Sequence, residues 1–433
     1  MTYTDEYKKR LISLEEAVGK IHSDDKVVVA MAAAQPPGLL STLHTIKDKV
    51  RRVKVIACLL LKDYEFLHDV GKGDDTPFIL EDWYFGGPER DLYKKGLATF
   101  IPNNLHSAGT EKLKAEHINV FMGTATPPDA RGYMSLSLNL VYEREMIEQA
   151  DLVILEINEN LPRTYGDTAI NIRDVDFVVE HNAPLLEFPP IEPSEVERLI
   201  GSHVSELIPD GATIQLGIGG IPNAITRFLA DKKDIGVHSE MITEGMADLI
   251  EAGVVNNSRK TLWKGKTIGA FIMGTQKLYD FVRDNMAVEV HRGSVVNDPY
   301  IVARNERMVS INTALQVDLA GQVCSESFGP MQYTGTGGQL DMHRGATMSK
   351  GGVGIIAMRS TAKNGTISTL QPMLTPGSFV TIPRQDTDCI VTEYGIARLK
   401  GLSVRERALA LIAIAHPDFR ESLTEEARKV NLI

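Results

Sequence analysis

A glutamate that follows a glycine-rich loop is the part of this sequence with the clearest capacity for chemistry. Glu240 lies within residues 235–241, where apolar side chains alternate with His238 and Glu240, as they do along a half-buried strand. A helix is predicted directly afterwards, over residues 246–252. A carboxylate at the end of a strand and just before a helix stands where α/β folds usually place their reactive groups. Upstream, the glycines of residues 217–220 can bring backbone N–H groups close to a ligand.

Two interpretations of this pairing need no covalent chemistry. Gly217 and Gly219 follow a predicted strand, and Glu240 stands about twenty residues later, as a ribose-binding acid does in a dinucleotide fold. Pro222, however, occupies the position of the third glycine, where close helix–strand packing requires a small residue. In the second interpretation the glycines only turn the chain, and the charge of Glu240 favours the N-terminus of the following helix.

The third interpretation is covalent catalysis by Glu240. A glutamate is ionised near neutral pH and therefore needs no base to act as a nucleophile. It can attack a thioester, expel a thiolate and form a mixed anhydride, and the oxyanion of each tetrahedral intermediate then requires N–H or amide donors. Two glycine loops, residues 217–220 and 335–341, and the turn at residues 297–299 can supply such donors. Together these features favour covalent catalysis over the two simpler interpretations.

Length and charge limit the kinds of partner that the chain can have. Its 433 residues predict about two or three domains, and no apolar run approaches the roughly 20 residues that cross a bilayer. A formal charge of −11, from 46 basic and 57 acidic residues, argues against nonspecific nucleic-acid binding. The first ten residues are polar and lack the apolar core of a signal peptide.

The cysteines and histidines indicate a compartment and exclude one kind of site. Cys58, Cys324 and Cys389 are widely spaced and lie in apolar runs, which is typical of buried free thiols in a reducing compartment. We therefore expect a cytoplasmic protein. None of the 11 histidines stands at a metal-ligand spacing with cysteines or acids, so no metal is predicted.

The order of predicted elements occurs twice along the chain. Residues 24–43 and residues 210–229 each read as an acidic turn, a strand (residues 27–31 and 213–216, respectively), a loop of small residues, a proline and a helix. An amphipathic helix that opens near a serine, Ser13 or Ser194, precedes each copy. The sequence therefore predicts two related α/β domains with mainly parallel sheets and an active site in the cleft between them.

Three prolines within residues 189–193 mark the boundary between these domains, because proline is excluded from sheet interiors and favours extended linkers. We expect an N-terminal α/β domain over residues 1–186 and a C-terminal catalytic α/β domain over residues 187–433. Further strands are predicted at residues 151–157, 267–273, 308–312, 354–358 and 379–382.

Short motifs with polar, glycine and proline residues extend over essentially the whole chain. They lie at residues 165–168, 215–222, 237–245, 271–275, 297–299, 335–341, 391–397 and 414–419. Each motif is short, but the set in this order resembles the acetyl-CoA hydrolase/transferase family, in particular its 4-hydroxybutyrate CoA-transferases.

The resemblance implies a ping-pong reaction that moves CoA between an acyl-CoA and a small carboxylic acid, such as 4-hydroxybutyrate or butyrate with acetyl-CoA and acetate. Glu240 matches the family's nucleophile and would form an acyl-glutamyl anhydride and then a glutamyl–CoA thioester. Asn297 and the N–H of Gly338 would donate to the oxyanion. CoA is a substrate here, and no tightly bound cofactor is implied. The residues expected to contact it are Gln215, Gly217, Ile218, Gly219, Gly220, Ile221, Gly338 and Met358.

Several of these roles have structural alternatives. Asn297 is also a common turn residue before a proline, Gln215 could instead bond within the sheet, and Met358 could pack in the core. His238 could tune Glu240 or form hydrogen bonds elsewhere in the fold.

Two positions depart from the family pattern. Gln35 stands where relatives known for 4-hydroxybutyrate often carry glutamate, and Met342 replaces a more usual aromatic residue. Both changes affect the expected acyl pocket, so butyrate or acetate could be preferred. An acyl-CoA hydrolase with the same glutamate is the alternative function, and a CoA-binding protein without turnover is a third. The resemblance also implies a homodimer, while the charge and the lack of a long apolar run predict no nucleic-acid or membrane partner.

Overall fold

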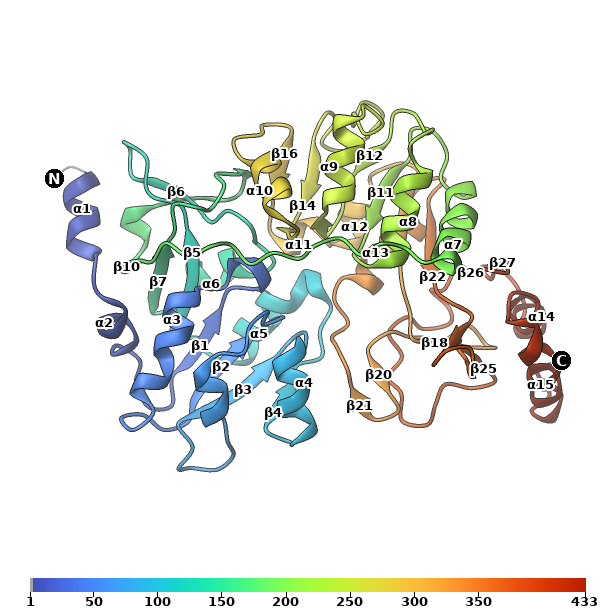
Figure 1. The fold of residues 1–433 in the computed structure, drawn as a ribbon, viewed down its shortest axis with the longest axis horizontal. Coiled ribbons are helices and arrows are strands. Elements are labelled where there is room, and N and C mark those ends of the chain that lie inside the picture. Colours follow the sequence, from blue (N-terminus) through green and yellow to red (C-terminus); the bar gives the residue numbers. More distant parts are fainter. Residues whose placement is uncertain (1–2) are drawn as a thin grey trace. The chain divides into compact units, whose positions relative to one another are not determined.

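The chain folds into two compact units (Figure 1). The computed structural model describes residues 3–433. The first unit contains the described residues up to Phe188 and the segment Gly269–Val295, and the second contains Pro189–Ile268 and Val296–Ile433. The domain limits of 1–186 and 187–433 stay a prediction. Residues 269–295 belong to the first unit although they follow part of the second unit in the sequence. This could not be predicted from the sequence, because it depends on contacts between segments that are distant along the chain.

One seven-stranded parallel sheet forms the centre of the first unit, in the order β10-β7-β5-β1-β2-β3-β4. Every residue of β5 is buried, as expected for a strand covered on both faces. The strands are β1 (Lys26–Val29), β2 (Val53–Ala57), β3 (Phe78–Asp82), β4 (Ala98–Phe100), β5 (Val120–Ala125), β7 (Leu152–Ile157) and β10 (Phe177–Glu180).

Helices cover this sheet and share its core. Val27 and Val29 of β1 belong to the same buried cluster as Leu39 and Leu43, which lie in and directly after α3. Ser13 caps α2 through a capping box, as its position before the predicted helix indicated. The helices are α1 (Tyr3–Arg10), α2 (Leu14–Val18), α3 (Pro37–Thr42), α4 (Gly87–Lys94), α5 (Ala108–Ala115), α6 (Glu143–Gln149) and α10 (Gln276–Val282).

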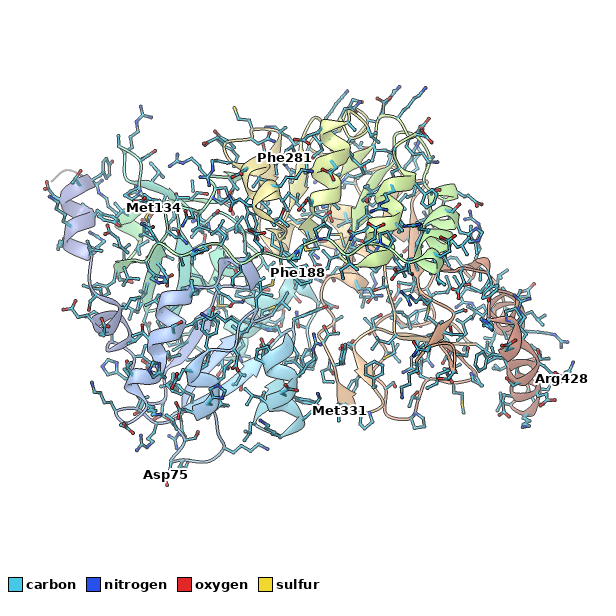
Figure 2. The ribbon with its side chains drawn as sticks, in the orientation of Figure 1. Asp75, Met134, Phe188, Phe281, Met331 and Arg428 are labelled. Carbon is cyan, nitrogen blue, oxygen red and sulfur yellow. The ribbon has the colours of Figure 1, made fainter. Side chains whose placement is uncertain are left out.

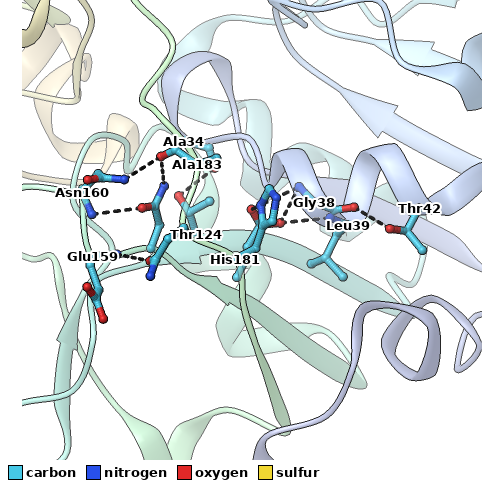
Figure 3. A network of polar contacts seen from close by, with 12 residues as sticks. Ala34, Gly38, Leu39, Thr42, Thr124, Glu159, Asn160, His181 and Ala183 are labelled. Carbon is cyan, nitrogen blue, oxygen red and sulfur yellow. Dashed lines mark hydrogen bonds and ion pairs between the residues drawn. The ribbon is translucent and has the colours of Figure 1, made fainter.

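Buried polar groups connect the carboxyl ends of β1, β5 and β7 (Figure 3). Glu156, near the end of β7, accepts a hydrogen bond from the N–H of Gly38 at 2.9 Å and contacts Nδ1 of His181 at 2.8 Å. The hydroxyl of Thr124 donates to the carbonyl of Ala34 at 3.0 Å. These contacts fix the loop that leads from β1 into α3.

A six-stranded sheet forms the centre of the second unit, in the order β12-β11-β17-β22-β26-β27. All neighbours are parallel except β26 and β27, which form an antiparallel edge. The predicted strands 213–216 and 308–312 are confirmed with the same bounds, and 354–358 is displaced by one residue. The strands are β11 (Thr213–Leu216), β12 (Gly236–Val237), β17 (Met308–Asn312), β22 (Val353–Ala357), β26 (Cys389–Thr392) and β27 (Gly395–Arg398).

This sheet is covered on both faces. Ile355 and Ala357 of β22 belong to one buried cluster, and their neighbours Ile356 and Met358 belong to another, since alternate residues of a strand point to opposite faces. The α-helices that lie wholly within the second unit are α7 (Glu195–Glu206), α8 (Gly220–Phe228), α9 (Glu244–Glu251), α12 (Pro299–Val302), α13 (Gln339–Met348), α14 (Val404–Ala413) and α15 (Pro417–Lys429). Ser194 forms the expected capping box at the start of α7.

The two large sheets repeat one arrangement, which confirms the predicted pair of related α/β domains. The series β10-β7-β5-β1-β2 in the first unit corresponds to β26-β22-β17-β11-β12 in the second. In register, Ile56 of β2 corresponds to Val237 of β12. Leu59 therefore occupies, in the first unit, the position that Glu240 occupies in the second.

The strand predicted at residues 379–382 is wrong. Only an isolated bridge between Val323 and Ile382 forms there. Phe379 and Val380 are 46% and 42% exposed, so this apolar run is not core. Pro383 follows directly. It has no N–H, so it cannot donate the next hydrogen bond that would extend the pairing between strands.

Short strands make up the remaining sheet structure. The segment 267–273, predicted as one strand, contains two, β14 (Thr267–Gly269) and β15 (Phe271–Ile272). The others are β6 (Tyr133–Ser135), β8 (Tyr165–Gly166), β9 (Ala169–Asn171), β13 (Met241–Ile242), β16 (Val288–Val290), β18 (Gln316–Asp318), β19 (Val323–Cys324), β20 (Ser327–Phe328), β21 (Met331–Gln332), β23 (Thr361–Ala362), β24 (Ile367–Ser368) and β25 (Leu370–Gln371).

The three cysteines are buried and form no disulfide, as predicted. Within residues 3–433, every helix is too short or too polar to cross a membrane. The same residues contain no group of three or more His, Cys, Asp or Glu side chains that could hold a metal ion.

Candidate active site

Glu240 lies in a short connection between two strands. The sequence predicted one continuous strand over residues 235–241, but β12 ends at Val237 and β13 begins at Met241. The hydroxyl of Ser239 donates to the carbonyl of Leu216 at 3.3 Å, and Leu216 is the last residue of β11. The connection therefore lies at the carboxyl end of the parallel sheet, which is where such sheets place reactive groups.

Two hydrogen-bond donors meet the carboxylate of Glu240. Nδ2 of Asn297 donates to Oε2 of Glu240 at 2.8 Å, and the backbone N–H of Gly338 lies beside the same carboxylate and lowers its pKa. A Cβ at position 338 would lie 1.7 Å from Oε2 of Glu240 and 2.1 Å from Nδ2 of Asn297. Only glycine fits there without displacing both groups. The second unit thus brings together Glu240, Asn297 and Gly338, the three residues that the family resemblance implied would act at the reacting carbonyl.

Two helix N-termini place these donors. Asn297 stands immediately before Asp298, whose side chain caps α12, and Gly338 is the N-terminal cap residue of α13. The two helices pack closely at Gly345 of α13. A Cβ at this position would lie only 2.5 Å from Cβ of Val302 in α12. This close packing brings the starts of both helices to the same carboxylate.

The environment of Glu240 disfavours its ionised form. Burial is the main cause that raises its pKa from 4.5 to about 7, and the nearby charge of Asp341 acts in the same direction. The hydrogen bonds from Asn297 and Gly338 act in the opposite direction. Near neutral pH the carboxyl is therefore less ionised than an exposed glutamate would be, whereas the sequence alone predicted an ionised glutamate.

Asp341 contributes to the site and was not predicted from the sequence. It is 2% exposed and lies on α13 three positions after Gly338. Residues at this spacing share one face of a helix, so the position of Gly338 at the start of α13 was the signal that could have found it.

His238 is held away from Glu240 by contacts within the fold. Its ring is fully buried, with Nε2 2.8 Å from the carbonyl of Val296 and Nδ1 3.3 Å from Nδ2 of Asn305. The ring also lies 5.7 Å from that of Trp263, measured between centroids. These contacts favour the structural alternative for this histidine.

The glycine loop exposes backbone at the start of α8. Gly219 has φ of 117° and ψ of −179°, a conformation that is available essentially only to glycine. A Cβ on Gly217 or Gly219 would meet no atom within 4 Å, and Ile218 between them is 38% exposed. Gly220 is buried against Glu197, and Ile221 is 7% exposed. The open part of the loop is thus limited to residues 217–219.

Two other residues predicted to contact CoA make contacts of a different kind. Oε1 of Gln215 accepts hydrogen bonds from the N–H of Ile311 and from Nδ2 of Asn312, so its side chain bonds within the sheet. Met358 is 2% exposed and belongs to a buried apolar cluster. For both residues a role in binding CoA stays a prediction.

The sequence matches known families over most of its length. The model of the acetyl-CoA hydrolase/transferase N-terminal domain matches residues 1–188, and that of the C-terminal domain matches residues 274–427. The chain is 44% identical over 430 residues to the 4-hydroxybutyrate coenzyme A transferase of Clostridium kluyveri, covering 99% of this chain and 100% of that protein.

The chain belongs to the acetyl-CoA hydrolase/transferase family. This confirms the resemblance that the ordered motifs indicated. The chain is also 41% identical over 435 residues to the succinyl-CoA:cyclohexane-1-carboxylate CoA transferase of Geobacter metallireducens. This match covers 100% of this chain and 98% of that protein. The crystal structure of RipA from Yersinia pestis superposes with a TM-score of 0.93 at 37% identity, and the match covers 100% of both chains. The α/β fold with mainly parallel sheets in two domains is therefore the fold of the family.

Proposed function

We propose that this chain is a CoA-transferase that moves CoA between an acyl-CoA and a small carboxylic acid through Glu240. The observation that supports this most directly is the meeting of an amide donor and a backbone N–H at one buried carboxylate. These donors come from the starts of α12 and α13 and not from α9, the helix that follows Glu240. Donors in this position can instead stabilise an oxyanion that forms beside the attacking group.

In the first half of the reaction, an ionised oxygen of Glu240 attacks the carbonyl carbon of the acyl-CoA thioester. The carbon–sulfur bond breaks, the CoA thiolate leaves, and an acyl-glutamyl anhydride forms. The thiolate then attacks the glutamyl carbonyl of this anhydride. The original acid departs as a carboxylate, and a glutamyl–CoA thioester is left on the enzyme.

In the second half, an incoming carboxylate repeats these steps in reverse order. It attacks the glutamyl thioester, releases the thiolate and forms a new anhydride, and the thiolate then attacks the acyl carbon of that anhydride. The new acyl-CoA leaves, and the Glu240 carboxylate is regenerated. Each step exchanges one acyl bond for another, so the thioester energy is conserved and no external energy source enters the balance. Asn297 and Gly338 donate to the oxyanion at each tetrahedral stage.

The acids that we propose are 4-hydroxybutyrate or butyrate, with acetyl-CoA and acetate as the other pair. The first follows the name of the relative from Clostridium kluyveri. The name of the Geobacter metallireducens relative specifies a cyclic acid, so a panel of linear and cyclic acids is the appropriate assay. A homodimeric state and a cytoplasmic location stay predictions from the sequence.

A comparison of CoA release with and without an acceptor acid tests the transferase proposal. Purified protein is incubated with acetyl-CoA or butyryl-CoA, and acyl-CoA species are separated at timed intervals. We expect a new acyl-CoA only when acetate, butyrate or 4-hydroxybutyrate is added. Free CoA that accumulates equally fast without an acid would instead assign the chain as an acyl-CoA hydrolase. Binding of CoA without any turnover would contradict both.

The pKa of Glu240 predicts an acidic limit to the reaction. Attack requires the ionised carboxylate, and its pKa lies at about 7. Below that pH, kcat/KM for acyl-CoA should fall about tenfold for each pH unit. The measurement is a profile of kcat/KM from pH 5 to 9, accompanied by melting curves at each pH to exclude unfolding. A profile that stays flat down to pH 5 would contradict the proposed state of Glu240.

A further inference from the structure

A buried glutamate outside the reacting groups holds the loop that carries Gly338. Glu326 is 5% exposed and stands directly before β20. The hydroxyl of Thr381 donates to its Oε1 at 2.8 Å, Nε2 of Gln332 donates to its Oε2 at 2.9 Å, and the hydroxyl of Thr336 lies 3.2 Å from Oε2. All of these donors are neutral groups. Thr336 stands only two residues before Gly338.

The backbone of Glu326 closes the same loop. Its carbonyl accepts hydrogen bonds from the N–H of Tyr333 at 2.7 Å and from that of Thr334 at 3.2 Å. The hairpin of β20 and β21 lies within this closed segment, and Met331 in it is 47% exposed (Figure 2). The exposed hairpin is thus joined at its base to a buried carboxylate, which fixes the chain just before the glycine loop.

A second anchor fixes the chain just after Gly338. Nε2 of Gln339 donates to the carbonyl of Thr313 at 3.1 Å, and the hydroxyl of Ser325 donates to the same carbonyl at 3.1 Å. Thr313 directly follows β17, so it belongs to the carboxyl end of the central sheet. Gly338 therefore lies between two anchors, one through Thr336 and Glu326, the other through Gln339 and the sheet.

We infer that Glu326 is a positioning residue, which through Thr336 holds the N–H of Gly338 against Glu240. This inference rests on the proposed function, because only a reaction at Glu240 gives that N–H a catalytic task. Glu326 does not touch the reacting atoms. Both oxygens of its carboxylate accept hydrogen bonds, from donors on both sides of the loop. A side chain of the same size with one accepting oxygen, or with none, cannot accept from all of these donors.

Replacement of Glu326 by glutamine tests this role. The amide keeps the shape but replaces one accepting oxygen by an NH2 group, which then faces donors from Gln332 or from the threonine hydroxyls. We expect kcat for CoA transfer to fall about 10- to 100-fold, as for other small misplacements of catalytic groups. KM for acyl-CoA should change less than about twofold, because the donor acts on the transition state.

The pH profile provides a readout that a merely structural residue would not change. The N–H of Gly338 lowers the pKa of Glu240, while burial and Asp341 raise it. A displaced N–H should therefore move the acidic limit of kcat/KM to higher pH in Glu326→Gln. An unmoved limit together with full kcat in the folded variant would overturn the inference.

Asp318→Asn is the matched control. Asp318 is also a buried carboxylate of the second unit, 2% exposed, and it accepts hydrogen bonds from the N–H of Ala320 and of Gln322 and from Nε2 of Gln322. These contacts are local to the β18–β19 turn. Asp318→Asn should therefore leave kcat and the acidic limit unchanged after correction for folded protein. Equal losses in Asp318→Asn and Glu326→Gln would overturn the inference.

Two further measurements keep the test decisive. If Glu326→Gln does not fold, Thr336→Val is the second variant. It removes one hydroxyl donor and leaves Glu326 with Gln332 and Thr381. We then expect a smaller fall in kcat and a shift of the acidic limit in the same direction, and wild-type values of both would overturn the inference.

If the wild-type protein transfers no CoA, the proposed function fails by itself. Titration of the isotope-labelled Glu240 carboxyl by NMR then decides whether Glu326 controls the Gly338 contact, since its pKa should rise in Glu326→Gln and stay unchanged if the inference is wrong.

Discussion

Replacement of Glu240 by glutamine should lower the rate of CoA transfer by about 10⁴-fold or more, as the removal of other catalytic nucleophiles does. The amide has no ionised oxygen, so neither the anhydride nor the glutamyl thioester can form. Its oxygen can still accept from Asn297 and Gly338, which leaves the surroundings of the site intact. The measurement is the initial rate of acyl exchange between acetyl-CoA and butyrate, combined with borohydride reduction of the enzyme after incubation with acyl-CoA. Only the wild type should be inactivated by that treatment.

The same substitution should not destabilise the fold. The pKa of Glu240 is about 7 in the folded chain and its ordinary value is 4.5, so the folded state binds the proton more tightly. The stabilising contribution of this carboxyl is therefore complete below about pH 4.5 and is lost as the pH rises through 7. Glu240→Gln removes the buried charge and should raise the melting temperature at pH 8 more than at pH 5.

Glu251→Gln is the appropriate control for this experiment. Glu251 is exposed at the end of α9, the helix that follows the site, so its substitution changes the same charge without touching the reacting groups. It should retain the wild-type rate. Full acyl exchange in Glu240→Gln would show that another group carries the reaction.

Replacement of Gly338 by alanine should lower kcat by about 10²- to 10³-fold, the range measured when one oxyanion donor is removed from an enzyme. The added Cβ would lie 1.7 Å from Oε2 of Glu240 and 2.1 Å from Nδ2 of Asn297. These atoms are ends of side chains, so they can move away while the backbone stays in place. The expected result is a folded protein whose nucleophile and amide donor are displaced together.

The control for Gly338→Ala is Gly87→Ala, because a Cβ at position 87 would meet no atom within 4 Å and the residue does not need a positive φ. Both variants are compared by kcat, by KM for acyl-CoA and by melting temperature. The expected pattern is a loss of kcat in Gly338→Ala alone, with both melting temperatures close to that of the wild type. Wild-type kcat in a folded Gly338→Ala would exclude the N–H of this residue from the reaction.

The fold could be predicted from the sequence wherever local pattern and burial agree. β11 and β17 are buried over all or nearly all of their residues, and their bounds were predicted without error. Ser194, with Glu197 three residues later, likewise indicated the start of α7 from purely local chemistry. Residues 379–382 are also rich in apolar side chains, but they form only an isolated bridge to Val323, and composition alone could not reveal this.

The site could be predicted in its members but not in its electrostatics. The order of the motifs indicated Glu240, Asn297 and Gly338 as members of the site. The fold brings these residues together, although Glu240 and Asn297 are 57 positions apart in the sequence. The raised pKa of Glu240 depends on how α13 packs, because that packing buries the carboxyl and places Asp341 near it. No pattern within the strand that precedes Glu240 contains this information.

The duplicated sheet arrangement has a consequence for stoichiometry. Leu59 occupies the register position in the first unit that Glu240 occupies in the second, and a leucine side chain can form neither an anhydride nor a thioester. Under the proposed mechanism one chain therefore carries one covalent adduct at a time, and the intact mass of a trapped sample should increase by a single increment.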